Sequence, residues 1–421
     1  MSVHRVMGVE TEYGIFAPQR PGADSAQLSA TVLEAYREAN AALDCPEPVR
    51  WDYSGTVPGS STDRRPTWVA RLTAQEEVWY RGSSLVTASG ARLYVDHGHP
   101  EHSSPEVMSP QEAVRYDVAG DLMMQRAMEH LTTSGGEPIV LFKNNVDGKG
   151  ASYGSHENYL VDRAVPFDML ADALVPFLVT RGICCGSGRV GLGPGSEEPG
   201  FQLWQRADYI ERRIGLETTV NRPIVNTRDE PHADPARWRR LHVITGDATS
   251  AQASTLLKVG TTSLVLSLVE SGRMKEDLGL VDPVAAIRTI SHDPGLDARV
   301  DLLDGRRLTG LEILRRYQFH VLAHLREELG GDPTVLADAD TREVLTRWDA
   351  VLTALETGSP EAGRWVEWVA KRELLEGFRA RDGLAWDDPR LVLVDLQWSH
   401  GTPGKGLARR LEARGRLERL T

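Results

Sequence analysis

Polar side chains recur at alternate positions in four segments whose composition predicts β-strands. The alternating sets are Glu10 and Glu12; Arg92, Tyr94 and Asp96; His156 and Asn158; and Arg240 and His242. Side chains two residues apart on a strand lie on the same face of a sheet. The intervening positions are apolar in two of these segments, as Leu93 and Leu241 illustrate. We therefore expect a sheet with one polar, open face and one face covered by helices.

The residue types on the expected polar face indicate metal and nucleotide chemistry. An ordinary solvated face would carry mostly lysine, threonine and serine, whereas this one carries carboxylates, histidines and arginines. Mg²⁺ prefers carboxylate oxygens and bridges them to nucleotide phosphates, and arginine binds phosphate through two parallel hydrogen bonds. His97 and His99 could suggest zinc, but no third histidine clusters with them and the neighbouring carboxylates suit a harder ion.

The bulk composition limits the protein class. The chain has 421 residues, 41% hydrophobic and 26% charged, which is typical of a globular protein with one large domain and an appendage, or two domains. A net charge of −12 argues against nucleic acid as a partner. The three cysteines have no Cys-x-x-Cys spacing, which argues against a thiolate zinc site. Their odd number, with two of them adjacent, argues for a reducing, cytoplasmic compartment. No apolar stretch reaches the ~20 residues that span a bilayer, so we expect no membrane partner.

Capping signals and turn residues predict the order of the elements. Capping boxes at Ser109–Glu112 and Thr309–Glu312 predict helices ending near Thr133 and Leu329. Hairpins are predicted around Ser89-Gly90 and Asp304-Gly305. Further strands are predicted at about 6–14, 138–145, 152–162 and 239–246, and helices at about 26–43, 167–181, 250–270, 341–355, 360–381 and 405–420. Residues 45–75, rich in proline, glycine and serine, predict a long irregular insertion, and about 309–421 is mostly helical.

Other polar segments leave their role open. The glycine-rich segment 143–150 could bind an anion through its backbone, but it lacks the spacing of a P-loop. No Gly-x-Ser-x-Gly motif is present, and apolar neighbours favour a structural role for Cys184. The charged loop 227–232 fits a salt-bridged turn and a functional loop equally well.

Long motifs carry a resemblance to a known family. They are MGVETEYGI at 7–15, ARLYVDHGHPEHSSPE at 91–106, LFKNNVDGKGASYGSHENYL at 141–160, NTRDEPHAD at 226–234 and RRLHVITGD at 239–247. These motifs resemble the Pup ligase/Pup deamidase family, which is related to glutamine synthetase, and the resemblance runs from Val6 through Leu420. It implies an α+β fold with a curved antiparallel sheet backed by helices, in one large catalytic domain over 1–421. It also implies that the small C-terminal domain of the family is missing here.

The resemblance assigns roles to individual residues. Positions associated with Mg²⁺ are Glu10, Tyr94, Glu101, His156 and His242. Positions associated with the nucleotide are Gly8, Glu12, Arg92, Ser103, Ser104, Asn158 and Arg240. Asp96 matches the catalytic aspartate of the family. The implied cofactors are ATP, or ADP plus phosphate, and Mg²⁺.

The family contains two kinds of enzyme. Ligases join the C-terminal glutamate of the small protein Pup to a substrate lysine at the expense of ATP; deamidases convert a C-terminal glutamine of Pup to glutamate and also cleave the isopeptide bond. This chain is similar to the deamidases in the segments 148–154 and 95–100 and in its insertion. Pup and pupylated proteins are thus the expected partners, with Asp96 as general base or nucleophile in amide hydrolysis. Ligation through an acyl phosphate is the alternative.

Overall fold

A computed structural model of the chain describes residues 2–41, 84–147 and 150–421. Its centre is a six-stranded antiparallel sheet in the order β12-β7-β1-β5-β4-β3. These strands are β1 (Met7–Glu12), β3 (Ser84–Val86), β4 (Arg92–Asp96), β5 (His99–Ser103), β7 (Ser155–Asp162) and β12 (Trp238–Val243). The insertion predicted at 45–75 lies outside the described residues.

Four two-stranded pairs surround this sheet in the described part of the chain. They are β2 (Gly14–Phe16) with β6 (Val140–Phe142), β8 (Arg189–Leu192) with β9 (Glu198–Gln202), β10 (Ile210–Gly215) with β11 (Arg222–Asn226), and β13 (Arg299–Asp301) with β14 (Arg307–Thr309). Only β10 and β11 run parallel to each other among these pairs. The predicted hairpin turn at Asp304-Gly305 connects β13 to β14, and the turn at Ser89-Gly90 connects β3 to β4.

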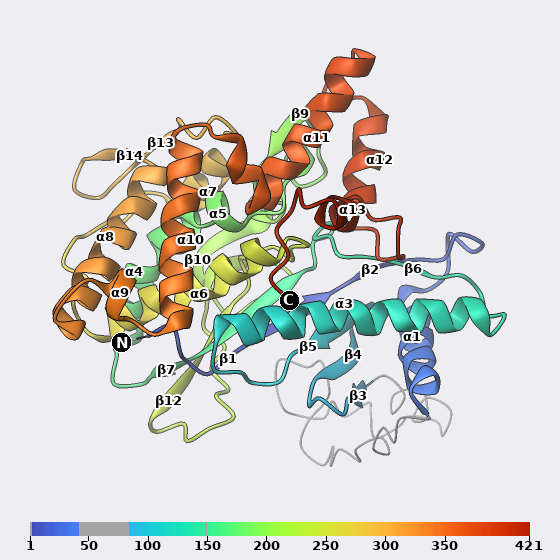
Figure 1. Cartoon of the computed structure of the whole chain (residues 1–421), viewed down its shortest axis with the longest axis horizontal. Helices are drawn as coiled ribbons and strands as arrows, with labels where there is room; N and C mark the ends of the chain where they lie inside the picture. Colours follow the sequence, from blue (N-terminus) through green and yellow to red (C-terminus); the bar gives the residue numbers. More distant parts are fainter. Residues whose placement is uncertain (1, 42–83, 148–149) are drawn as a thin grey trace.

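Helices make up most of the remaining structure (Figure 1). They are α1 (Ser25–Ala39), α3 (Pro110–Thr133), α4 (Phe167–Thr180), α5 (Gly182–Cys185), α6 (Gln252–Glu270), α7 (Pro283–Ser291), α8 (Gly310–Leu329), α9 (Pro333–Leu336), α10 (Ala339–Glu356), α11 (Glu367–Asp382), α12 (Pro389–Trp398) and α13 (Leu407–Ala413). Both predicted capping boxes are present, at the starts of α3 and α8. The predicted α+β class is confirmed.

Two apolar cores lie behind the sheet. One packs the apolar face of β1, β7 and β12 against α4, α6, α8 and α10, and contains Val9 and Leu241. The other packs β3 and β4 against α1 and α3, and contains Tyr13 and Leu93. We call this helix-covered side of the sheet the back face and the opposite side the front face. Along β1 the back-facing residues pass from the first core at Val9 to the second at Tyr13, with the buried Thr11 between them.

Strand β5 was not predicted from the sequence. Its residues, His-Pro-Glu-His-Ser, include a proline and contain none of the β-branched aliphatic side chains that usually mark a strand. Pairing on both sides, with β1 and β4, holds the segment extended. The turn before it is formed by His97 and Gly98, whose φ angles of 46° and 88° match a two-residue hairpin with two left-handed positions.

Two helix predictions near the C-terminus were wrong in extent. The helix predicted over 360–381 is divided into a 3₁₀ turn, Pro360–Arg364, and α11. The helix predicted over 405–420 is confined to α13, because Gly415 takes a left-handed φ of 69°. The chain then turns back so that the amides of Leu420 and Thr421 donate to the side chain of Gln252.

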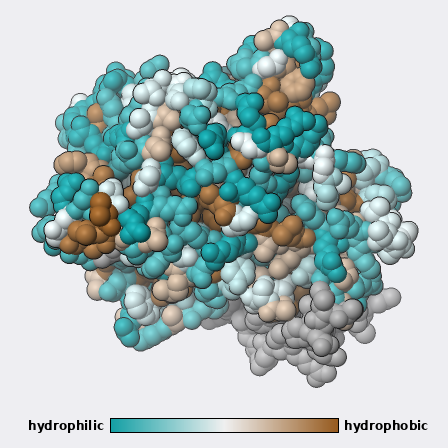
Figure 2. Space-filling model, viewed as in Figure 1, coloured by the Kyte–Doolittle hydropathy of each residue, from teal (hydrophilic) through white to brown (hydrophobic). Residues whose placement is uncertain are grey.

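The surface is mostly polar on the face shown in Figure 2, with apolar residues in separate small patches. Val392 and Leu393, on helix α12, are among the exposed large apolar residues. Among the described residues, no helix combines the length and apolar character needed to cross a membrane.

Candidate metal and nucleotide site

The strand register brings the predicted polar residues onto the front face of the sheet. Directly opposed residues are Glu10 with Ser103 and with His156; Glu12 with Glu101; Tyr94 with Glu101; Arg92 with Ser103; Asp96 with His99; and Asn158 with Gly8 and with His242. Residues directly opposite each other in an antiparallel pair have their side chains on the same face. Alternation therefore predicted the shared face correctly, and the register adds His99 and Glu101 from the unpredicted strand.

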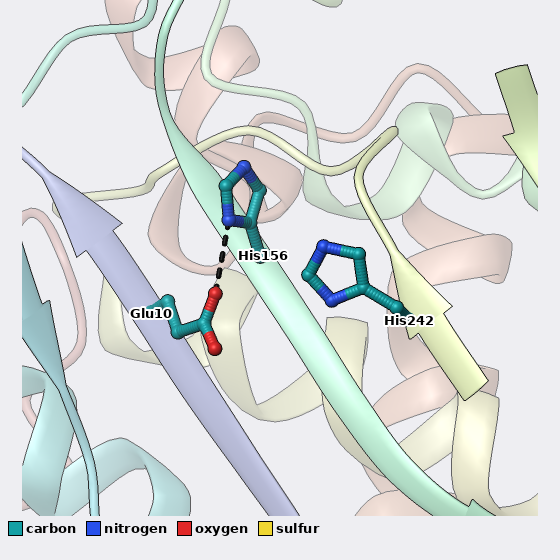
Figure 3. Close-up of side chains that lie close together, drawn as sticks. All are labelled: Glu10, His156 and His242. Atoms are coloured by element: carbon teal, nitrogen blue, oxygen red, sulfur yellow. Dashed lines mark hydrogen bonds and ion pairs between the residues drawn. The ribbon is translucent and has the colours of Figure 1, made fainter. Parts of the chain in front are cut away.

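Glu10 belongs to a chain of hydrogen bonds that joins β1, β7 and β12. Figure 3 shows the bond between Glu10 and His156, with His242 beside them. Its Oε2 is 3.0 Å from His156 Nδ1, and its Oε1 accepts a 2.9 Å hydrogen bond from Asn158 Nδ2. Asn158 Oδ1 lies 2.8 Å from His242 Nδ1. The two imidazole rings are 5.1 Å apart between centroids and meet edge to face. These contacts fix the orientation of all four side chains on the front face.

The hydrogen bonds also determine which histidine nitrogens can act as ligands. Asn158 Oδ1 is an acceptor, so His242 carries its hydrogen on Nδ1 and keeps a lone pair on Nε2. His242 is 1% exposed, and its Nε2 has no hydrogen-bond partner among the residues described. Burial lowers the pKa of His242 well below its ordinary value, so the ring stays neutral. A neutral ring with an unused Nε2 can bind a metal ion.

Three carboxylates on β1 and β5 line the same face. Glu101 is 1% exposed, and in the described structure neither of its carboxylate oxygens has a hydrogen-bond partner. Burial, with the charges of Glu12, Asp96 and Glu10, raises the pKa of Glu101 well above its ordinary value. Glu12 accepts a 2.9 Å hydrogen bond from the Gly154 amide. Burial alone would raise the pKa of Glu10, but the hydrogen bond from His156 and the nearby positive groups hold it well below its ordinary range.

These residues fit a hard divalent cation. Two overlapping sets of three residues each have their ligand atoms within 4.8 Å of one another. The first set is Glu10, His156 and His242, and the second is Glu12, Glu101 and His156. Two buried carboxylates, Glu12 and Glu101, and the half-buried Glu10 match the oxygen donors that Mg²⁺ prefers, and both oxygens of Glu101 are unpaired among the described residues. An uncompensated buried carboxylate is costly, and a bound cation would remove that cost.

Asp96 lies at the end of β4, at one edge of this face. Its Oδ2 is 3.0 Å from Nδ1 of His97, whose side chain is 59% exposed. The hydrogen bond to Asp96 raises the pKa of His97. His99, opposite Asp96, stacks on Tyr153 with ring centroids 4.2 Å apart. Neither His97 nor His99 belongs to a three-residue metal-type group among the described residues.

The remaining residues predicted to bind nucleotide lie around this face. The guanidinium of Arg92 is 4.3 Å from the centre of the Tyr94 ring, and Ser103 Oγ donates to the Tyr94 hydroxyl at 3.3 Å. Arg240 lies 3.6 Å from Glu230, and its charge helps to lower the pKa of Glu10.

The nucleotide positions Gly8 and Ser104 adjoin each other. The Ser104 hydroxyl accepts a hydrogen bond from the Val9 amide at 3.0 Å and donates to the Pro105 carbonyl at 2.9 Å. A Cβ on Gly8 would lie 3.4 Å from Ser104 Oγ, and Gly8 is directly opposite Asn158 in the sheet.

Sequence reasoning missed two buried arginines near this site. Arg206 and Arg222 are 1% and 7% exposed, and no described carboxylate forms an ion pair with either. Burial lowers the pKa of both, and the charge of Glu12 opposes this shift. Both are isolated arginines in irregular or short-strand sequence, and neither repeats at the spacing of the four polar strands. No pattern in the sequence marks them.

The charged loop 227–232 contains a salt-bridged turn. Asp229 pairs with Arg163 at 2.8 Å and with Arg239 at 3.7 Å, and it also accepts a hydrogen bond from the Arg240 amide. The loop thereby fixes the start of β12, which carries His242. Its structural role is clear, and Arg228 within it contributes positive charge near His242.

Comparison with known proteins places this site in a family. The family model described as "Pup-ligase protein" matches residues 5–421. The depupylase of Acidothermus cellulolyticus is 45% identical over 99% of this chain and 82% of its own length. The Pup deamidase/depupylase of Mycolicibacterium smegmatis is 48% identical over 99% of this chain and 83% of its own length.

Two solved structures share the fold. The Pup ligase PafA in complex with Pup matches with a TM-score of 0.79 at 34% identity, over 100% of this chain and 77% of that one. PafA in complex with ADP matches with a TM-score of 0.73 at 38% identity, over 86% of this chain and 79% of that one. The chain is thus a homologue of Pup deamidase/depupylases and belongs to the Pup-ligase family.

Proposed function

We propose that this protein is an ATP- and Mg²⁺-dependent amide hydrolase that deamidates the C-terminal glutamine of Pup and cleaves the isopeptide bond between Pup and a lysine. Identity to the depupylase and the deamidase/depupylase, at 45% and 48% over 99% of the chain, favours hydrolysis over ligation. Pup–protein ligases are less similar, at 43% and 40% identity over 84% and 86% of the chain.

The observation that carries the cofactor proposal is the unpaired, buried carboxylate of Glu101 between Glu12 and Tyr94. Glu10, Glu12, Glu101, His156 and His242 would hold Mg²⁺ together with the nucleotide phosphates. The bound ion would supply positive charge next to the amide, and the phosphates would supply oxygens in fixed positions. The match to PafA in complex with ADP supports nucleotide binding.

The chain's own residues would perform the proton transfers. Amide hydrolysis needs an attacking oxygen, a polarised carbonyl and a protonated leaving amine. Asp96 lies at the edge of the front face, where it would take a proton from water or attack the carbonyl itself. His97, bound to Asp96 at 3.0 Å, would orient this carboxylate. Arg206 and Arg222 would place positive charge beside the developing negative charge of the carbonyl oxygen.

The direct test uses glutamine-ended Pup and a Pup–protein conjugate, each with and without ATP and Mg²⁺. We expect release of ammonia from the first substrate and of Pup from the second, with ATP consumed far below one molecule per cleavage. Glutamate-ended Pup and a target lysine should remain unjoined under the same conditions. Formation of a conjugate with stoichiometric ATP consumption would instead identify the chain as a ligase.

The role of Asp96 can be tested by Asp96→Asn, which keeps the shape of the side chain and removes its charge. We expect cleavage to fall by at least about 100-fold, the lower end of what acid–base catalysis contributes, while nucleotide binding measured by calorimetry stays near that of the wild type. Asp301→Asn, on the exposed strand β13, is the matched control. Near-normal turnover by Asp96→Asn would refute the assignment.

A further inference from the structure

The back of β1 carries an ordered set of polar contacts that the proposed chemistry does not use. Thr11 Oγ1 donates to Asp117 Oδ1 at 3.2 Å, and the Tyr13 hydroxyl donates to Asp121 Oδ1 at 2.8 Å. All four residues are buried. Thr11 is on β1, and Tyr13 is two residues further along, directly after the last residue of the strand, whereas Asp117 and Asp121 are one helical turn apart on α3. The two spacings, about 6.7 Å along a strand and about 6 Å along a helix, match each other.

Two cations complete this back-face cluster. Lys143 Nζ lies 2.9 Å from Asp117 and 3.2 Å from Asp121, and it is buried with them. Arg409, on α13 near the end of the chain, lies 2.6 Å from Asp121. The two carboxylates are thus balanced by two positive groups, one of them from a segment about 290 residues away in sequence.

The neighbouring strand β5 adjoins the same cluster. His102 is directly opposite Thr11 and fully buried, and a Cβ on Gly120 of α3 would lie only 2.6 Å from its Nδ1. Helix α3 therefore approaches β5 as closely as a glycine permits. His102 stands between Glu101 and Ser103, and Thr11 stands between Glu10 and Glu12. The back-face contacts and the front-face carboxylates alternate along the same two strands.

We propose that Asp117 and Asp121 are positioning residues for the metal site: by holding Thr11 and Tyr13 they fix the position of β1 and so the spacing of Glu10 and Glu12 relative to Glu101. Arg409 extends this contact to the C-terminal helix. This inference rests on the proposed function, because it takes the front face as the place where Mg²⁺ and nucleotide bind. A backbone that must present three carboxylates to one small ion tolerates little movement, because Mg²⁺ demands near-ideal octahedral geometry.

The test removes single hydroxyls from the back face without changing the shape of the side chains. Thr11→Val and Tyr13→Phe are the test variants. Thr11→Ser keeps the hydroxyl and should behave as the wild type. Tyr317→Phe removes a buried hydroxyl that donates to Ala173 in the first core, away from this cluster, and is the matched control. The readouts are the Mg²⁺ concentration that half-saturates ATP binding and the stability of the metal-free protein.

We expect Thr11→Val and Tyr13→Phe to raise the half-saturating Mg²⁺ concentration by about tenfold, the lower end of the effect of outer partners of metal ligands. Tyr317→Phe should lower stability and leave this concentration unchanged. Arg409→Met should raise it as well, whereas Arg410→Met, the exposed neighbour on α13, should not. The comparison of binding with stability separates positioning from a general loosening of the fold.

Several results would overturn the inference. Unchanged Mg²⁺ dependence in both hydroxyl variants would show that the back-face contacts only stabilise the fold, and an equal shift in Tyr317→Phe would show that any loss of core stability weakens the site. If the wild type itself binds no Mg²⁺–ATP, the proposed function fails first. The wild-type measurement therefore distinguishes the two failures.

Discussion

Glu101 gives a prediction in which stability and metal binding change in opposite directions. Its carboxylate is buried, its two oxygens are unpaired within the described structure, and its pKa is raised well above 4.5 by burial and by the charges of Glu12, Asp96 and Glu10. Replacing it by glutamine keeps the shape and removes the ionisable group. We expect Glu101→Gln to stabilise the metal-free protein at alkaline pH and to abolish tight Mg²⁺ binding.

The sign follows from proton binding in the two states. Below about pH 4.5 the glutamate is neutral both folded and unfolded, so Glu101 and glutamine differ little. Above that pH the unfolded chain loses the proton while the folded chain keeps it, until the pH reaches the raised pKa. The folded state then binds more protons, so the free energy of unfolding of the wild type falls as pH rises through this window. In Glu101→Gln this group cannot ionise, so it makes no contribution to the fall of the free energy of unfolding with pH.

The size of the effect follows from the burial of the group. A buried polar or charged group without a partner costs about 1–3 kcal/mol or more. At about 2.1 cal/mol/K of unfolding entropy per residue, a 421-residue chain shifts its melting temperature by about 1 °C per kcal/mol. We therefore expect Glu101→Gln to melt about 1–3 °C above the wild type at pH 8, and at nearly the same temperature near pH 4.5.

The assay is thermal unfolding of the metal-free protein at several pH values, combined with calorimetry of Mg²⁺–ATP binding in buffers of different ionisation enthalpy. Wild-type binding should release a proton, because the ion requires the ionised carboxylate, and the apparent affinity should rise with pH. Glu106→Gln, which replaces an exposed glutamate just beyond β5, is the control. Equal pH slopes for wild type and Glu101→Gln, or unchanged Mg²⁺ binding by the variant, would refute the reasoning.

Two further predictions concern the packing behind the sheet. Glu157→Gln breaks a fully buried bidentate pair with Arg181, at 2.6 and 2.7 Å, and should lower the free energy of unfolding by about 3–5 kcal/mol in urea titrations, with little dependence on salt. Gly120→Ala should cost about 1–3 kcal/mol because its Cβ would overlap His102. Gly377→Ala, on exposed α11 with nothing within 4 Å, should instead stabilise by about 0.5–1 kcal/mol. A stabilising Gly120→Ala, or a Glu157→Gln of wild-type stability, would contradict these arguments.

The front face could be predicted from the sequence because strand geometry has a strict period of two. Once a segment is identified as a strand, the side chains that share a face are known, as for Glu10 with Glu12 and His156 with Asn158. The alternation along each strand does not predict the order of the strands in the sheet or their register. Glu101 was assigned only through the family resemblance, because β5 is held extended by its two neighbours and carries little strand propensity of its own.

Arg206 and Arg222 could not be found from the sequence for a different physical reason. In sequence, a single arginine next to a polar residue, as both of these are, is indistinguishable from the many arginines that form surface ion pairs. What sets these two apart is that both are buried without a described carboxylate, and that property depends on segments distant in the chain. The same holds for the insertion at 45–75, whose composition predicts an irregular segment and nothing about its position.

The back-face cluster shows how far a site can depend on residues that carry no chemical signal. In sequence, Asp117 and Asp121 look like ordinary polar positions on an amphipathic helix, and Thr11 looks like a spacer between two glutamates. Only the crossing of α3 over β1 brings them into contact. The polar groups behind β1 are paired within the protein, whereas Glu101 of β5, which faces Glu12 across the front, has no hydrogen-bond partner among the described residues. The strand is therefore held from behind while a carboxylate opposite its front stays unpaired among the described residues, which is the arrangement expected of a preorganised metal site.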